Sequence, residues 1–356
     1  MNYVAALRVG LNDVKALVNL EPARKTQVVP LLSMRGKDER HLDTFVNTWG
    51  GSSFYLDISR FPGDANDPYL TQHALNSSAN AYAAKRAFYA ATATKNEALV
   101  PVVGWADDDS SRDVVQAALL LAAQFPRIAL RVDVERDVAR QWPTAQNVLN
   151  SVSTPASVDV ILDFRKLTDI PSLTTGGWLQ RLVRDIHSYQ VARIVIVSTS
   201  FPDDKPASGT SRTVVCQDLA WQLAFQATVP EVSLIYGDYA ATNPTGVMEF
   251  IPGMPVIPFA NYFAPQEWWQ MRQGGDKEFH HYPAIATAIR ALPGYHGDPF
   301  CWATREIARI AGSTANYGNN GTWNGFRINQ HICAVLQYLA LRGVPPVDGE
   351  FDDEDL

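Results

Sequence analysis

One short pattern recurs along this chain: an apolar run of β-strand type that ends in an acid, usually with an arginine or tyrosine beside it. Val158–Lys166 reads V-D-V-I-L-D-F-R-K, and Ile128–Arg136 reads I-A-L-R-V-D-V-E-R. Ser53–Arg60 and Val232–Tyr239 repeat it as S-F-Y-L-D-I-S-R and V-S-L-I-Y-G-D-Y. Near-continuous runs of Val, Ile and Leu are typical of parallel strands that are covered on both faces. The pattern therefore predicts a parallel sheet with polar side chains at one edge.

Segments of helical spacing separate these strands. We expect strands at residues 3–9, 28–34, 54–58, 99–105, 128–134, 158–164, 193–199 and 232–236, with further strands at 256–262 and 268–272. The expected helices lie at residues 12–20, 38–49, 75–94, 114–125, 139–151, 178–189 and 214–227, and in most of 282–341. A polar loop is expected at residues 201–211. Eight strand–helix units in 356 residues predict an α/β fold, a TIM-like (β/α)8 barrel with a helical C-terminal extension.

The length and charge of the chain fit a single barrel domain, and they argue against a protein that binds nucleic acid over a broad surface. We expect residues 1–345 to form one domain that includes the C-terminal helices, and residues 346–356 to be a disordered acidic tail. The formal net charge is −7, and six acids lie between Asp348 and Asp355. The remaining chain is close to neutral and has no run of Lys or Arg, which argues against a broad nucleic-acid surface.

The cysteines and the N-terminus indicate a cytoplasmic protein. Cys216, Cys301 and Cys333 are widely spaced and odd in number, which does not suit a disulfide framework and fits a reducing compartment. Residues 1–10 contain no apolar core of a signal peptide, and no window resembles a membrane span. We therefore expect neither secretion nor contact with a membrane.

The strand-end residues are the candidate functional site, because (β/α)8 barrels carry their sites at the carboxyl ends of the strands. The candidate catalytic residues are the strand-end acids Asp57, Asp133, Asp163 and Asp238. The candidate ligand-binding residues are Arg35, Arg60, Arg131, Arg165, Tyr239 and Tyr262. The competing interpretation is structural, since an Asp at a strand end often caps the next helix or pairs with a nearby Arg.

Two kinds of chemistry suit such a rim. Converging carboxylates can hold a hard cation such as Mg²⁺ or Mn²⁺, or they can divide the roles of general acid and general base. Interleaved arginines can hold a phosphate, because a guanidinium matches phosphate oxygens with two parallel hydrogen bonds. A sugar-active enzyme would use the same acids, at a separation of about 5–10 Å, together with the tryptophans. The metal itself is not indicated by any motif.

Two other stretches have alternative interpretations. His280 and His281 follow Glu278 and resemble a metal cluster in composition, but they lack the spacing of a helical zinc motif, and a solvated loop is favoured. Asn316–Arg327 reads N-Y-G-N-N-G-T-W-N-G-F-R and overlaps an expected loop at residues 312–325. It is either a lid over the rim or a connection between helices.

The opening Y-V-A-A-L-R-V-G-L-N-D-V-K-A-L-V-N-L and the following V-V-P-L-L-S-M-R-G resemble the start of the phage "beta protein" family. The late Gly237-Asp238-Tyr239 resembles the Gly-Asp-Tyr of that family, whereas Ala5 and Ser33 stand where it usually has Pro and Glu. The resemblance implies a protein encoded by phages, prophages or bacterial mobile islands. It brings no established catalytic residues.

Two functional hypotheses follow. The first is a cytoplasmic protein of phage–host conflict whose rim binds a phosphorylated ligand, in its most concrete form a metal-dependent hydrolase of nucleotides or nucleic acid. The second is a non-catalytic barrel that binds a phage or toxin protein as an antitoxin, immunity factor or sensor. In that case the acidic tail and the long loops would be the contact surfaces.

Overall fold

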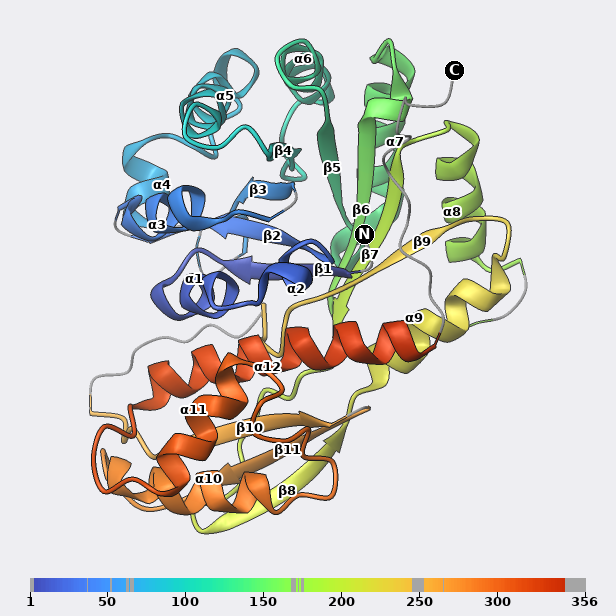
Figure 1. Cartoon of the computed structure of the whole chain (residues 1–356). Coiled ribbons are helices and arrows are strands. Elements are labelled where there is room, and N and C mark those ends of the chain that lie inside the picture. The colour runs from blue at the N-terminus through green and yellow to red at the C-terminus, as the bar shows by residue number, and fades with distance from the viewer. Residues whose placement is uncertain are drawn as a thin grey trace, which may run out of the picture.

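Eight parallel strands close into a barrel in the order β1-β2-β3-β4-β5-β6-β7-β9, seen in the upper part of Figure 1. This architecture comes from a computed structural model. The structure describes residues 3–342 except 37, 52, 62–63, 65–66, 168–170, 172, 174–175, 245–252 and 265. The barrel strands are β1 Tyr3–Arg8, β2 Val28–Met34, β3 Phe54–Ile58, β4 Leu99–Val103, β5 Ile128–Asp133, β6 Val158–Lys166, β7 Arg193–Thr199 and β9 Leu234–Asp238. The predicted TIM-like barrel is confirmed.

Successive side chains along each barrel strand point to opposite faces, and this alternation produces two apolar clusters. Side chains of one parity fill the barrel, and the cluster there includes Val4, Val29, Tyr55, Val102, Ile161, Val195 and Ile235. Side chains of the other parity face the helices and join a larger cluster. Because the period of a strand is two, the residues two positions beyond Tyr55 and Ile161 also point inward. These residues are Asp57 and Asp163, so the pleat itself directs both acids into the barrel.

Helices follow most strands and cover the outside of the barrel. They are α1 Leu11–Val18, α2 Pro22–Lys25, α3 Arg40–Thr48, α4 Pro68–Gln72, α5 Ala79–Ala93, α6 Ser111–Ala122, α7 Val134–Ser151, α8 Trp178–Ser188 and α9 Gln217–Thr228, with a short 3₁₀ turn at Pro155–Ser157. In α8 the buried residues Leu179, Leu182, Val183 and Ile186 recur at helical spacing. Burying each such side chain contributes about 1.5–3 kcal/mol, which holds the helix against the strands.

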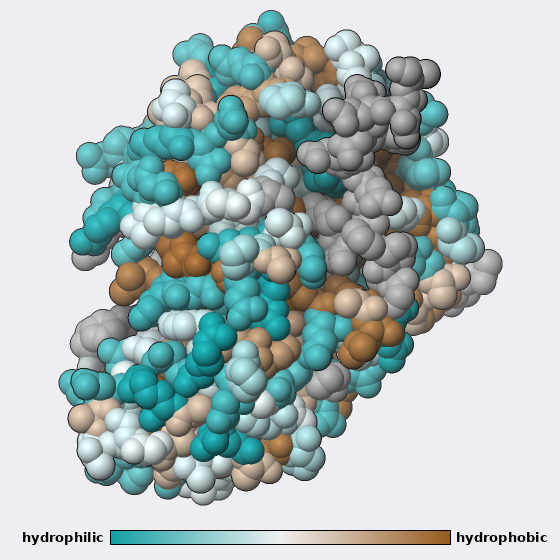
Figure 2. Space-filling view, in the orientation of Figure 1, coloured by the Kyte–Doolittle hydropathy of each residue, from teal (hydrophilic) through white to brown (hydrophobic). Residues whose placement is uncertain are grey.

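A second unit packs against the barrel. An antiparallel sheet of order β10-β11-β8 contains β8 Thr210–Val215, β10 Phe259–Ala264 and β11 Glu267–Arg272. With it come α10 Tyr282–Arg290, α11 Trp302–Ala311, α12 Asn320–Leu341 and a 3₁₀ turn at Phe279–His281. Figure 1 shows α12 lying between the barrel and this sheet. Figure 2 shows hydrophilic and hydrophobic residues interspersed over this face of both units.

The antiparallel sheet confirms two predicted strands and corrects the predicted loop and helix before them. The strands expected at 256–262 and 268–272 exist as β10 and β11, but they pair with each other and not with the barrel. Part of the expected polar loop and the start of the expected helix at 214 form β8, an edge strand with mostly exposed residues. A polar edge strand carries no buried apolar run, so its sequence resembles a loop.

The C-terminal region is helical, as expected, but α12 begins earlier than predicted. The helix starts at Asn320, where the side chain of Asn319 accepts a hydrogen bond from the backbone of Thr322 at 3.1 Å. Trp323 stacks on Tyr282 at 4.5 Å between ring centroids, which anchors the first turn. Most of the stretch proposed as a lid is therefore a packed helix end. The predicted acidic tail at residues 346–356 lies outside the described residues.

Candidate functional site

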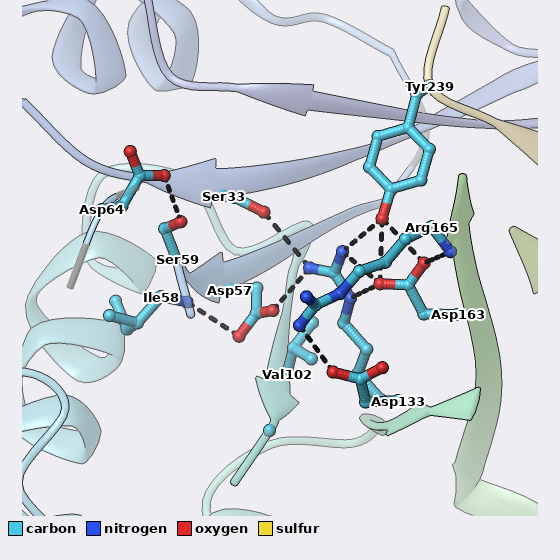
Figure 3. Close-up of polar contacts among 12 residues, drawn as sticks. Ser33, Asp57, Ile58, Ser59, Asp64, Val102, Asp133, Asp163, Arg165 and Tyr239 are labelled. Carbon is cyan, nitrogen blue, oxygen red and sulfur yellow. Dashed lines mark hydrogen bonds and ion pairs between the residues drawn. The ribbon is translucent and has the colours of Figure 1, made fainter. Parts of the chain in front are cut away.

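Three of the predicted strand-end acids meet at the carboxyl ends of β3, β5 and β6. Figure 3 shows Asp57, Asp133 and Asp163 close together around Arg165. The pocket between them, which we term the mouth pocket, is lined by Asp57, Arg60, Phe61, Gly104, Trp105, Arg131, Asp133, Asp163 and Arg165. Its volume of about 30 Å³ is room for about one water molecule. The fold thus gathers most of the predicted residues in one small space.

Arg131 connects two of the three acids. Its Nη1 lies 2.7 Å from Oδ2 of Asp57, and its Nη2 lies 2.7 Å from Oδ2 of Asp163. The same guanidinium donates to Oγ of Ser33 at 3.2 Å and to the hydroxyl of Tyr239 at 3.0 Å. Only 9% of the Arg131 side chain is exposed. Charge-assisted hydrogen bonds in such a low-dielectric environment are stronger than bonds at the surface.

The charge states of this network are fixed by its own contacts. Burial acts to lower the pKa of Arg131, but the carboxylates of Asp163 and Asp57 outweigh it and raise that pKa. Burial also raises the pKa of Tyr239, and the nearby Asp163 carboxylate raises it further. The Tyr239 hydroxyl donates to Oδ1 of Asp163 at 2.7 Å. Arg131 therefore remains a cation and Tyr239 a neutral donor.

Arg165 is held mainly by acids on the preceding strand β5 and on α7. Its Nη2 lies 2.5 Å from Oδ2 of Asp133, and its Nη1 lies 3.5 Å from Glu135. The ladder between β6 and β7 shifts register between Asp163 and Arg165, and Arg165 has a φ of 49°. Its Nε is buried and has no hydrogen-bond partner among the described residues. Bulges and positive φ angles concentrate at functional sites, where they redirect a side chain.

One aromatic ring supports three of the guanidiniums. The Cζ atoms of Arg8, Arg131 and Arg165 lie 5.2, 5.6 and 5.3 Å from the centroid of Phe61. The face of the ring carries partial negative charge and attracts cations. Phe61 therefore reduces the cost of bringing three like charges together.

The remaining predicted arginines have acids of their own. Arg60 lines the mouth pocket and pairs with Asp109 at 3.1 Å. Arg35 does not line the pocket, and its Nη1 lies 3.1 Å from Asp64. Asp109 and Asp64 follow strand-end loops and were not among the predicted site residues. The rim is therefore close to electrically balanced.

Asp238 does not belong to the mouth pocket, which corrects its predicted place. Since side chains alternate along β9, Tyr239 points into the barrel and Asp238 points outward. There Oδ2 of Asp238 lies 2.7 Å from Nε2 of His331 on α12 and accepts from the Tyr236 hydroxyl at 2.9 Å. Burial acts to raise the pKa of Asp238, but His331 outweighs it, and the pKa is lowered. Asp238 therefore fastens the second unit to the barrel.

Tyr262 also lies away from the predicted rim. It belongs to β10 of the antiparallel sheet, and its hydroxyl lies 2.7 Å from Nδ1 of His296. The prediction treated residues 256–262 as a strand like those of the barrel, and the pairing of β10 with β11 places Tyr262 in the second unit.

Lys85 is a site residue that the prediction did not include. Its Nζ donates to the carbonyl of Gly104 at 3.1 Å and lies 4.0 Å from Oδ1 of Asp57. Burial lowers the pKa of Lys85 to about 7, with a further contribution from Arg60. A signal was present in the sequence, because Lys85 occupies the apolar face of α5 together with Tyr82 and Tyr89. A lysine in the middle of a buried helical stripe is rarely a surface charge.

Asp57 and Asp163 do not fit a Mg²⁺ or Mn²⁺ ion held between them. A metal bridging Asp57 and Asp163 would occupy the space between their carboxylates. The guanidinium of Arg131 fills that space, at 2.7 Å from both. A cation placed there would have to displace another cation that is already hydrogen-bonded to both acids. We therefore assign no metal role to this pair.

The histidine pair outside the barrel is a compact turn. The ligand atoms of Glu278, His280 and His281 lie within 4.8 Å of one another. Glu278 and His280 are exposed, and Glu278 also accepts from the backbone of Gly275 at 2.7 Å. These contacts agree with the solvated loop that the sequence favours.

Comparison with known proteins identifies a family. The family model described as "Beta protein" matches residues 3–337, through the barrel and into α12. No curated protein matches the chain. Within the described residues, no helix has the length and apolar character that crossing a membrane requires. A match over nearly the whole chain confirms the resemblance seen in its opening strands, and the chain belongs to the Beta protein family.

Proposed function

We propose that the mouth pocket binds the phosphate group of a small ligand, a nucleotide being the leading candidate, in a cytoplasmic protein of phage–host conflict. The observation that carries the proposal is the convergence of Arg60, Arg131 and Arg165 on one pocket at the carboxyl ends of barrel strands. Barrel enzymes bind ligands at this end, and guanidinium groups suit phosphate oxygens. The phage–host setting follows from the resemblance to a phage-encoded family.

Within this proposal the arginines have different roles. Arg131 is saturated by Asp57 and Asp163, so we assign it the support of the pocket. Arg165 has an unpaired Nε among the described residues and is held through its tip by Asp133. Exchange of that carboxylate for a ligand phosphate would keep Arg165 neutralised. We therefore assign Arg165 the direct contact with the ligand.

The hydrolytic version of the proposal uses Asp133 as general base. When a phosphate takes over the Arg165 guanidinium, the Asp133 carboxylate can accept a proton from an attacking water. The water oxygen then bonds to phosphorus, the P–O bond to the leaving group breaks, and the leaving group departs with the electron pair of that bond. Arg165 would stabilise the charge that spreads over the phosphoryl oxygens. This version contains no metal, in contrast to the metal-dependent form expected from the sequence alone.

A non-catalytic barrel that binds a partner protein is the second candidate. It is favoured by the small pocket volume of about 30 Å³ and by the fact that every pocket arginine has a carboxylate partner. A site that is saturated by its own ion pairs can simply hold the strand ends together. An antitoxin, immunity factor or sensor would then use other surfaces.

Isothermal titration calorimetry with ATP, ADP and inorganic phosphate, in the presence of EDTA, separates the two candidates. We expect binding by the parent protein and a loss of about tenfold or more in Arg165→Gln, equal to about 1.4 kcal/mol. Arg305→Gln is the matched control, because Arg305 is exposed and pairs with Glu21 at 3.1 Å. Absence of binding of any of the three ligands to the parent would overturn the proposal and favour the partner-binding barrel.

A further inference from the structure

Three cations of the second unit lie beside two aromatic rings, Phe201 and Phe259. Lys205 precedes β8, Arg272 ends β11, and Arg327 lies in α12. The Nζ of Lys205 lies 5.3 Å from the centroid of Phe259, which is the cross-strand partner of Arg272. The Cζ of Arg327 lies 5.0 Å from the centroid of Phe201. We term Lys205, Arg272 and Arg327 the cationic cluster; its members come from separate segments that only the fold brings together.

Within the described residues no direct ion pair neutralises the cationic cluster, although the Asp13 carboxylate acts on Arg327. None of its members forms an ion pair with an acid in the described part of the chain. Asp204, the neighbour of Lys205, pairs instead with Arg212 at 2.7 Å. The Nε of Arg327 is buried and has no hydrogen-bond partner among the residues described. Leaving a buried cation unpaired costs free energy, so the cluster has a charge excess that an anion would relieve.

The two arginines of the cluster act on the charge of Lys205. Partial burial lowers the pKa of Lys205, and the charges of Arg272 and Arg327 lower it further. Burial also lowers the pKa of Arg327 to about 10, opposed only by Asp13. Asp13 lies in α1, which follows the carboxyl end of β1. The cluster therefore faces the same end of the barrel as the mouth pocket.

We propose that the cationic cluster is a second anion-binding site, which takes the phosphate group of a small phosphorylated ligand. Two guanidiniums offer hydrogen bonds in planar pairs, and an ammonium adds a compact charge, the combination that suits a phosphate dianion. Phe201 and Phe259 hold two of the cations in place before the ligand arrives, which reduces the entropy lost on binding. None of these residues lines the mouth pocket, so the site is independent of the function proposed above.

The test is calorimetric titration of the full-length protein with inorganic phosphate at low ionic strength. The Arg165→Gln protein serves as background, because it removes the ligand contact assigned to the mouth pocket. We expect phosphate to bind this protein, and binding to weaken about tenfold or more when Arg327→Gln is added. Lys205→Gln, at an exposed position, should weaken binding in the same direction and covers the case in which Arg327→Gln does not fold.

Arg342→Gln is the matched control. The Cζ of Arg342 also lies over an aromatic ring, 4.9 Å from the centroid of Tyr338, but it lies outside the cluster. Phosphate affinity should be unchanged in this variant. Equal affinity in Arg342→Gln, Lys205→Gln and Arg327→Gln would overturn the proposal. So would loss of all phosphate binding in Arg165→Gln alone, which would locate the anion in the mouth pocket.

Discussion

The Nζ of Lys85 lies 4.0 Å from Oδ1 of Asp57, at the wall of the mouth pocket. Only 3% of the lysine side chain is exposed, and its one hydrogen bond among the described residues goes to a backbone carbonyl. A carboxylate at this distance compensates the ammonium only in part. The pKa of about 7 follows from that imbalance, and it makes Lys85 a group whose charge changes near neutral pH.

We predict that Lys85→Met removes a pH dependence of stability. In the unfolded chain the lysine titrates near its usual 10.5, whereas in the fold it titrates at about 7. Between these values the unfolded state binds more protons, so the parent gains stability relative to Lys85→Met as pH rises from 7 to 9. The gain is at most about 1.4 kcal/mol per pH unit. Urea unfolding of both proteins across this range measures it.

Lys95→Met makes the same chemical change at the surface. Lys95 is exposed, and its Nζ lies 2.7 Å from Asp43. The stability difference between the parent and Lys95→Met should change little between pH 7 and 9. A Lys85→Met protein whose stability runs parallel to the parent across this range would show that Lys85 is charged in the fold.

We predict that Arg131→Met lowers the free energy of unfolding more than the same change at an exposed arginine does. The change leaves the Asp57 and Asp163 carboxylates buried without their cation, which costs about 3–5 kcal/mol. Adding Asp163→Asn should recover part of the lost stability, because it removes one of the two carboxylates that are left without their cation. Chemical denaturation of the single and double variants measures both effects. A double variant less stable than Arg131→Met would contradict an origin in uncompensated charge.

The sequence predicts the barrel well because buried parallel strands appear in it as continuous apolar runs. Each of the eight runs from residue 3 to residue 236 became a barrel strand, with ends that differ by a few residues. The strand-end acids of β3, β5 and β6 converge for the same reason: carboxyl ends of parallel strands meet at one end of a barrel. Asp57, Asp133 and Asp163 were therefore predictable as a group.

The sequence does not reveal which face of a strand a side chain occupies or which distant residue it pairs with. Asp238 ends a barrel strand as Asp163 does, but the opposite parity turns it outward to His331, which lies 93 positions further along the chain. A strand end can be recognised from a local run, whereas the face a residue adopts depends on register with its neighbours. Strand β8 was missed because an exposed edge strand has no apolar run. Lys85 was not predicted because it lies on a helix face, whereas the predicted site residues were taken from strand ends.

We predict that Asp238→Asn destabilises the protein at neutral pH by about 3 kcal/mol, since it removes the anionic partner of buried His331. The pKa of Asp238 in the fold lies below its usual 3.8. Its stabilising contribution is therefore present above that value and is lost as pH falls through the lower, folded pKa. The deficit of the variant should shrink only below about pH 4. A deficit that shrinks between pH 7 and 5 would contradict this assignment.

Asp13 is predicted to behave in the opposite way. Burial raises its pKa to about 6, with only partial relief from Arg35 and Arg327. Between 3.8 and 6 the folded state holds a proton that the unfolded chain has lost, so charging Asp13 destabilises the fold above pH 6. Asp13→Asn should therefore stabilise the protein at pH 7, and the gain should vanish near pH 4. Thermal unfolding at both pH values measures it, with Asp43→Asn, at a partly exposed position, as control. A loss of stability at pH 7 would show that the Asp13 carboxylate makes a favourable ion pair across to α12.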